Sequence, residues 1–171
     1  MKNILVFLLI LFCVSCSSSS NNKKSTKSVI CPQVLYASEH NKYLDTDKDL
    51  ITLDNITFKA NLNNHAFNKT CTKTDDITSI PLDILFIIKP LKPTSSEITL
   101  PVYSALLDNE KNIIDIQYFS LSGNINKDFD NENYMETELS KSINIITKTK
   151  VPVSKIILGF MLDKNRKELL N

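Results

Sequence analysis

The chain has 171 residues, and its 20 lysine and arginine residues nearly balance its 19 aspartate and glutamate residues, for a formal net charge of +1. This length predicts a single domain, and the near-neutral balance argues against nucleic acid as a partner. Hydrophobic residues make up 42% and charged residues 23% of the sequence, which fits neither a disordered acidic chain nor a protein of many membrane spans. With two glycines in all, the sequence has no glycine-rich phosphate-binding loop.

The N-terminal segment has the pattern of an export signal. Lys2 precedes an apolar run over residues 4–12, which suits a secretory signal peptide and is too short for a membrane-spanning helix. Ser15 and Cys16 then resemble the lipobox of bacterial lipoproteins, although Cys13 stands where that family usually has leucine. The resemblance implies that Cys16 is acylated and becomes the new N-terminus. An ordinary signal peptide and an uncut N-terminal anchor are the alternatives.

The residues after the lipobox indicate a flexible tether. Residues 17–28 are Ser, Asn, Lys and Thr without an apolar side chain, and random-coil scaling gives them a reach of about 20 Å. In lipoproteins a serine after the acylated cysteine, here Ser17, implies release to the outer membrane, on its periplasmic face. The sequence therefore predicts a signal peptide over 1–15, an acylated cysteine with a tether over 16–28, and a folded domain over 29–171.

Two cysteines remain once the signal peptide and the acylated cysteine are set aside. Cys31 and Cys71 are expected to pair in an oxidising compartment, and closing a loop of this length contributes on the order of 3–4 kcal/mol. The alternative is a metal site, because His40 and His65 lie between the two cysteines. None of the intervals has the short chelate spacing of structural zinc sites, so we interpret both histidines as ordinary surface residues.

Most of the remaining chain has the alternation of apolar and polar residues that is typical of strands. Residues 56–63 show it most clearly, whereas residues 82–89 form a continuous β-branched run that indicates a central core strand. Polar, turn-rich residues separate the segments. The expected strands cover residues 29–37, 56–63, 82–89, 98–107, 113–121, 142–147 and 155–162.

The number and spacing of these strands predict an all-β fold, an antiparallel immunoglobulin-like β-sandwich with a short C-terminal helix. Asp163 is the expected N-cap of that helix, over residues 164–170. Arg166 is the only arginine, which we attribute to compositional bias towards Lys, Asn and Ile rather than to function. Prolines are expected at strand ends, where a missing N–H costs little; they are Pro81, Pro90, Pro93, Pro101 and Pro152.

Three short motifs together resemble a family of small alphaproteobacterial envelope lipoproteins of unassigned function. They are Cys31-Pro32-Gln33-Val34, Leu100-Pro101-Val102-Tyr103 and Ile157-Leu158-Gly159-Phe160-Met161-Leu162. In that family a Cys-Pro start, a second cysteine at similar spacing and a Val-Gly-Phe-Gln-Leu strand near the end share one chain. The resemblance covers most of residues 29–171, with departures at Leu158 and Met161. It implies an envelope location and lends no catalytic residue.

Acidic clusters are a second pattern that could indicate ion binding. Asp45, Asp47 and Asp49 alternate as at the start of a calcium loop, but Leu50 and Ile56 stand where such a loop needs glycine and glutamate. A solvated acidic loop is therefore expected there. The same interpretation applies to a second cluster, formed by Asp128, Asp130 and Glu132.

We therefore expect a lipid-anchored periplasmic protein that is a structural or protein-interaction module rather than an enzyme, with no cofactor. Its partners would be membrane lipid, through the acylated Cys16, and another envelope protein, through pairing of an edge strand. The alternative is a solute- or ion-binding lipoprotein that uses the acidic loops or aromatic side chains. The aromatic candidates for a binding face are Tyr103, Tyr118, Phe119 and Tyr134.

Overall fold

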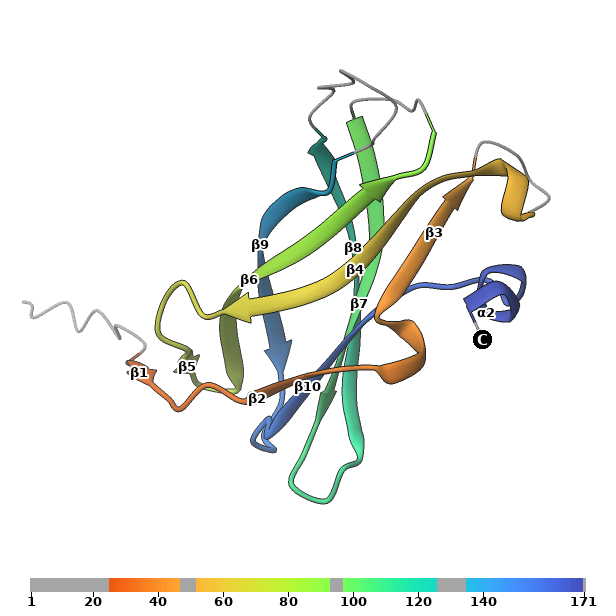
Figure 1. The fold of residues 1–171 in the computed structure, drawn as a ribbon. Helices are drawn as coiled ribbons and strands as arrows, with labels where there is room; N and C mark the ends of the chain where they lie inside the picture. The colour runs from red at the N-terminus through yellow and green to blue at the C-terminus, as the bar shows by residue number, and fades with distance from the viewer. Residues whose placement is uncertain (1–24, 47–51, 93–96, 126–134, 171) are drawn as a thin grey trace, which may run out of the picture.

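The computed structural model describes residues 25–46, 52–92, 97–125 and 135–170, which form two stacked β-sheets and a short C-terminal helix (Figure 1). The predicted all-β sandwich is confirmed. The helices of these residues include none that is long and apolar enough to cross a membrane. The strands are β1 (Thr26–Ser28), β2 (Gln33–Tyr36), β3 (Lys42–Thr46), β4 (Ile56–Ala66), β5 (Thr72–Thr74), β6 (Ile77–Pro90), β7 (Glu97–Leu107), β8 (Ile113–Asn124), β9 (Thr137–Lys148) and β10 (Lys155–Phe160), with 3-10 turns η2 (Ser38–His40) and η3 (Leu53–Asn55) and the helix α2 (Lys164–Leu170).

The first sheet is built around β6, its longest strand. β9 pairs along one side of β6. On the other side, β5 pairs with the first residues of β6 and β4 pairs with its second half. β1 extends the sheet beyond β5, and β3 extends it beyond β4. Burial alternates strictly along β6, so one face of this sheet turns inward and the other turns to solvent.

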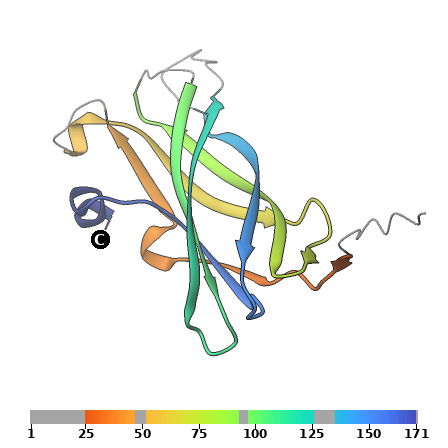
Figure 2. The same ribbon diagram turned by 180° about the vertical axis from the view of Figure 1, so that it is seen from behind.

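The second sheet has the order β2-β10-β7-β8. Its pairs are antiparallel except for β2 and β10, which run parallel. Seen from the front and from behind, its strands cross those of the first sheet obliquely (Figures 1 and 2). The inward side chains of both sheets form one continuous core. Aromatic contacts join the sheets there, because the Phe160 ring lies 5.8 Å from that of Phe86 and 5.5 Å from that of Tyr43.

The sandwich closes where β8 and β9 lie against each other. Gln117 Nε2 of β8 donates to the Ile146 carbonyl of β9 at 2.8 Å. Further along, Gly123 lies so close to β9 that a Cβ atom there would sit 2.5 Å from Leu139 Cδ1. The edge strands of the two sheets can approach this closely only because position 123 carries no side chain.

The opposite edge, β3, is covered by α2. Asp163 caps the helix as predicted, because its Oδ1 accepts a hydrogen bond from the Arg166 amide at 2.8 Å. Arg166 Nε donates to the Leu44 carbonyl at 2.8 Å, and the guanidinium lies over the Tyr43 ring. Lys167 forms an ion pair with Glu39 of η2 at 2.8 Å. The single arginine thus occupies a backbone acceptor of an edge strand, which is one way in which proteins block unwanted strand pairing.

Two of the proline predictions are wrong. Pro90 ends β6 as expected, but Pro81 and Pro101 lie inside β6 and β7. Pro81 pairs with Asn144 of β9 on one side and faces the interruption between β4 and β5 on the other. Pro101 is positioned just past the end of the β10 pairing. A missing N–H is tolerated at both sites because no neighbouring strand pairs with the proline on one side. Pro152 lies in the loop between β9 and β10, and Pro93 lies outside the described residues.

The boundary between tether and domain also needs correction. Thr26–Ser28, assigned above to the tether, form β1 and pair with β5. All three residues are exposed, so backbone hydrogen bonding rather than apolar burial holds them. The single strand expected over 29–37 is instead β2 alone, preceded by an irregular segment that contains Cys31. Strands β3 and β5 were not predicted, because both are short and carry few apolar residues.

We predict that Gly123→Val destabilises the domain although valine favours strands more than glycine does. The new side chain would collide with Leu139, and overpacking of this kind costs about 1–3 kcal/mol. Denaturant unfolding with the disulfide intact measures the effect. Ser122→Val, at the adjacent exposed position, is the matched control and is expected to stay within about 0.5 kcal/mol. Equal stability of the two variants would contradict the close contact between β8 and β9.

Candidate functional site

The predicted disulfide is present at the start of the folded domain. Cys31 and Cys71 are bonded, with their Cα atoms 5.3 Å apart. Cys71 is fully buried and packs in the core. The amide of Val29 donates to the Cys71 carbonyl at 2.9 Å. The bond therefore fastens the incoming chain to the residue that precedes β5.

His65 points into the sandwich because of a bulge in β4. The register of β4 against β6 shifts between Leu62 and Asn64, after which His65 pairs with the inward-facing Ile84. Without the extra residue, the alternation of the strand would turn His65 to the outside. Its Nδ1 lies 3.0 Å from the Tyr36 hydroxyl of β2, and the two rings meet edge to face. The pair thus bridges the two sheets.

Burial shifts the pKa values of His65 and Tyr36 in opposite directions. It lowers the pKa of His65 and raises the pKa of Tyr36, because both charged forms lose hydration. With both groups neutral, the tautomer of the imidazole determines whether the phenol or the ring donates in this hydrogen bond. The interpretation of both histidines as ordinary surface residues is therefore wrong. His40 is also half-buried; its Nδ1 lies 3.1 Å from the Phe160 carbonyl, and its ring packs edge-on against Tyr103.

The geometry does not bring a metal site together. Cys31 and Cys71 are consumed by the disulfide, and each histidine has its own hydrogen-bond partner. Throughout the part of the chain that the structure describes, no group of three or more His, Cys, Asp or Glu residues is placed to hold a metal ion. Asp45 accepts a hydrogen bond from Thr57 Oγ1 at 2.7 Å, which stabilises the β3–β4 pair.

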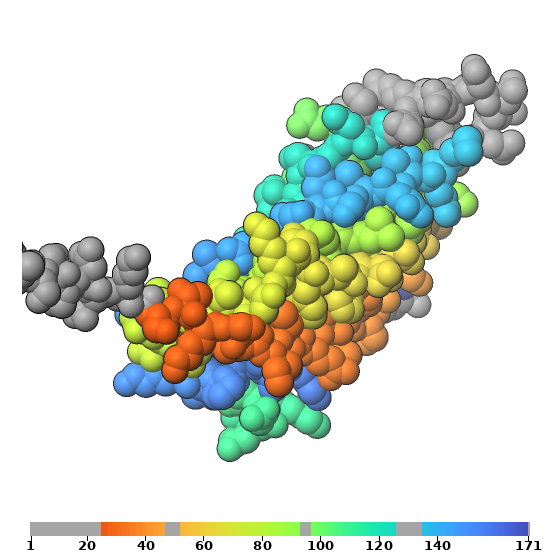
Figure 3. Space-filling model, turned by 90° about the vertical axis from the view of Figure 1, so that its left-hand side faces the viewer, coloured from red at the N-terminus to blue at the C-terminus, as the bar shows by residue number. Residues whose placement is uncertain are grey.

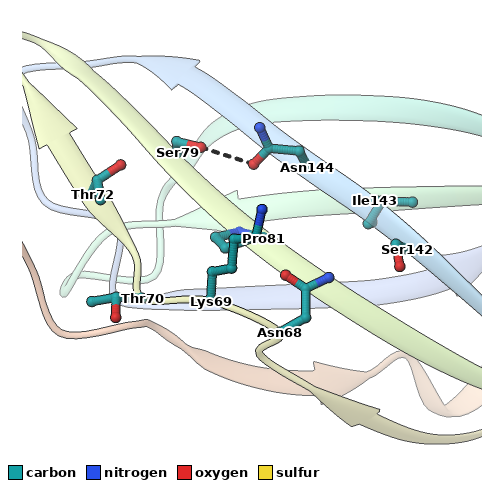
Figure 4. A pocket seen from close by; sticks show the side chains of 9 residues that line it. All are labelled: Asn68, Lys69, Thr70, Thr72, Ser79, Pro81, Ser142, Ile143 and Asn144. Atoms are coloured by element: carbon teal, nitrogen blue, oxygen red, sulfur yellow. Dashed lines mark hydrogen bonds between the residues drawn. The ribbon is translucent and has the colours of Figure 1, made fainter.

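A polar hollow of about 560 Å³ lies on the outer face of the first sheet, at the interruption between β4 and β5 (Figure 4). Ser79 Oγ donates to Asn144 Oδ1 at 2.8 Å on its floor. At its rim, Asn68 Nδ2 and Ser142 Oγ both donate to Asp83 Oδ1, which lowers the Asp83 pKa. These groups can hydrogen-bond a polar solute, but the hollow is open to solvent and brings together no nucleophile and base. Its lining residues are Asn68, Lys69, Thr70, Thr72, Ser79, Pro81, Ser142, Ile143 and Asn144.

The outer face of the second sheet is apolar across its full width. Leu35 of β2, Ile157 of β10, Ala105 of β7 and Ile116 of β8 are register partners in one row. Their neighbours along each strand are buried or partly buried, so all four side chains point outward, although Ala105 is only 7% exposed. Leu35 is 39% and Ile116 is 41% exposed. We refer to this row and the adjacent tyrosines as the apolar face.

Two tyrosines form the next row of the apolar face. Tyr103 of β7 and Tyr118 of β8 are register partners, and Tyr118 is 66% exposed. The Tyr103 ring lies flat over the next strand because Gly159 leaves room for it; a Cβ there would be 2.6 Å from the ring. Phe119, the neighbouring candidate, points inward and packs against the core. The structure thus divides the predicted aromatic set, with two members on the surface and one inside.

The outer face of the first sheet is different, because polar side chains border its apolar ones. Leu85 and Ile87 of β6 lie between Asn61 and Asn64 of β4 on one side and a row of β9 on the other. That row carries exposed polar side chains at Glu138, Ser140, Ser142 and Asn144. An uninterrupted apolar row across four strands is therefore specific to the second sheet among the described residues.

Several predicted site residues cannot be placed. Cys16, the proposed lipidation site, and the signal peptide lie outside the described residues. The second acidic cluster, two residues of the first cluster and one aromatic candidate also lie outside the described residues. They are Asp128, Asp130 and Glu132; Asp47 and Asp49; and Tyr134. Conversely, the row of Leu35, Ile157, Ala105 and Ile116 was not predicted from the sequence. Its only signal was that apolar residues occur at both alternating positions of these strands.

Comparison of the chain with protein-family models, curated protein sequences and solved structures finds no match. The resemblance to small envelope lipoproteins therefore stays a prediction.

We predict that the free energy of unfolding falls as the pH drops below about 6.5, the pKa of an exposed histidine. His65 has a lowered pKa in the folded state, so in this range the unfolded chain binds more protons and is favoured. The loss should level off below the folded-state pKa. The lowered carboxyl pKa values of Glu39, Asp83 and Asp108 act at more acidic pH.

Denaturant unfolding between pH 5 and pH 7.5 measures this effect. His65→Asn keeps an acceptor near the Tyr36 hydroxyl without titrating, and we expect it to flatten the pH dependence in this window. His40→Asn is the control and should leave the slope in place. A wild-type slope that persists in His65→Asn would show that another group is responsible.

Proposed function

We propose that the protein is a lipid-anchored interaction module of the bacterial cell envelope, held at the outer membrane through Cys16 and facing the periplasm. The observation that carries the interaction role is the apolar face, which spans all four strands of the second sheet. The largest contiguous apolar patch of a soluble domain is often a functional surface.

Two observations support the envelope location. The Cys31–Cys71 disulfide is of the kind that forms and persists in exported proteins. The polar sequence between Cys16 and Ser25 leads directly into β1 at one end of the sandwich. An acyl chain at Cys16 would therefore hold the domain by its first strand, close to the disulfide.

The size of the apolar face favours a transient protein partner over a stable homodimer. Four strands about 4.8 Å apart, with two outward rows about 7 Å apart, give an area of about 270 Å². A stable dimer needs about 800 Å² from each copy. The tether has no apolar side chain that could cover the face. The occupant that fits is a patch of another envelope protein with aliphatic and aromatic side chains of its own.

We place the contact on the face rather than on a sheet edge. The edge of β3 is occupied by Arg166, and β8 and β9 lie against each other. The remaining edge strands, β1 and β2, have three and four residues. A partner strand would gain few backbone hydrogen bonds there, whereas the face offers buried apolar area.

The test is site-specific photo-crosslinking in intact cells, with a photoreactive phenylalanine analogue at position 116 or 118. We expect both positions to give the same discrete protein adduct, and Leu35→Ser in the same chain to reduce its yield several-fold. An analogue at position 87, on the outer face of the first sheet, is the matched control and should give no such adduct.

Three outcomes would contradict the proposal. An adduct of twice the chain mass would indicate a homodimer, and an adduct with lipid would indicate that the face lies on the membrane. A yield that does not change with Leu35→Ser would mean that the apolar face does not bind the cross-linked protein.

A further inference from the structure

The end of the sandwich at which the described chain begins carries a concentration of lysines. Lys27 of β1 and Lys73 of β5 are register partners and together line a hollow of about 380 Å³. Lys148 pairs with Ile77 at the start of β6, and Lys150 follows in the next loop. This loop is attached to the same end, because the Thr149 amide donates to the Asp76 carbonyl at 2.8 Å.

Exposed apolar side chains lie among these lysines. Ile30 is 96% exposed, more than any other large apolar residue of the described chain, and Val151 is 48% exposed. Ile30 also lines a second hollow, of about 200 Å³, together with Lys73, Pro152 and the disulfide-bonded Cys71. We refer to Lys27, Ile30, Lys73, Lys148, Lys150 and Val151 as the tether corner. Figure 3 shows β1 and the end of β9 at the same end of the molecule.

The charge of this corner is positive overall. Its acidic residues are Asp75, in the hollow beside Lys27 and Lys73, and Asp76 in the same turn. The four lysines of the corner outnumber these two carboxylates, and Lys23 and Lys24 precede the corner in the sequence. A pair of lysines in register does not by itself distinguish this corner, because Lys59 and Lys89 are also register partners, at the other end of β6. The combination of lysines with an almost fully exposed isoleucine is typical of surfaces that bind anionic lipid headgroups.

The position of the corner supplies the geometric argument. Nine residues lie between Cys16 and Thr26, and random-coil scaling gives a sequence of this length an end-to-end distance of about 17 Å. If Cys16 is acylated, the corner is therefore held within a few nanometres of the leaflet, at a high effective concentration. The apolar face belongs to the other sheet.

We propose that the tether corner docks on the anionic phospholipids of the leaflet that holds the acyl chains, with Ile30 inserted among the headgroups and the lysines against the phosphates. This inference rests on the proposed lipid anchor. Docking would fix the orientation of the domain and keep the apolar face accessible to a protein partner.

Fluorescence of the acylated full-length protein in vesicles tests the inference, because the chain has no tryptophan. Ile30→Trp places a single probe at the corner. Leu53→Trp, at a 73% exposed position in η3, is the control. In vesicles of brominated phosphatidylglycerol we expect at least twofold quenching of the probe at position 30 and none at position 53. Brominated phosphatidylcholine should quench position 30 much less.

A second pair of variants tests the role of the lysines. Lys27→Gln with Lys73→Gln should abolish most of the quenching at position 30, whereas Lys59→Gln with Lys89→Gln should not change it. Protein that fails to float with the vesicles would overturn the lipid anchor itself. Protein that floats while position 30 stays unquenched, or is quenched equally in both lipids, would overturn the docking inference alone.

Discussion

The covalent bond between Cys31 and Cys71 is the constraint on which the N-terminal part of the structure depends. The chain changes sheets at Cys31, because β1 before it joins the first sheet and β2 after it joins the second. Neither strand has more than four residues, and neither buries enough apolar area to stay in place alone. The disulfide closes a loop of 40 residues and contributes about 3–4 kcal/mol by the chain-entropy account. The Tyr36–His65 hydrogen bond also joins the two sheets.

With that end fixed, the molecule has two surfaces of different chemistry. The tether corner is rich in lysine and lies where the chain enters the domain. The apolar face covers the outside of the other sheet and is continuous from β2 to β8. If Cys16 is acylated as proposed, the domain is held by its first strand, and the apolar face is free to be presented to a partner.

Local sequence patterns predicted the features that depend on the alternation of apolar and polar residues and on the number of cysteines. The strands with clear periodicity, the Asp163 cap and the cysteine pair could all be predicted from the sequence. The features that could not be predicted from the sequence depend on contacts between residues that are far apart in the chain. One extra residue after Leu62 turns His65 inward, a gap between β4 and β5 tolerates Pro81, and Arg166 acquires a role only because α2 packs on β3. The apolar face was missed for the same reason, since its four members come from four strands whose order is set by tertiary structure.

The central claim, an exported and acylated domain with a disulfide at its entry, is tested most directly by intact mass spectrometry of the protein from its native membranes. We expect the mass of residues 16–171 plus acyl chains, with a gain of two hydrogens on reduction, as one disulfide requires. An unacylated chain would contradict the lipid anchor, whether the signal peptide is cut or retained. An acylated chain with free thiols would contradict the role given to Cys31 and Cys71.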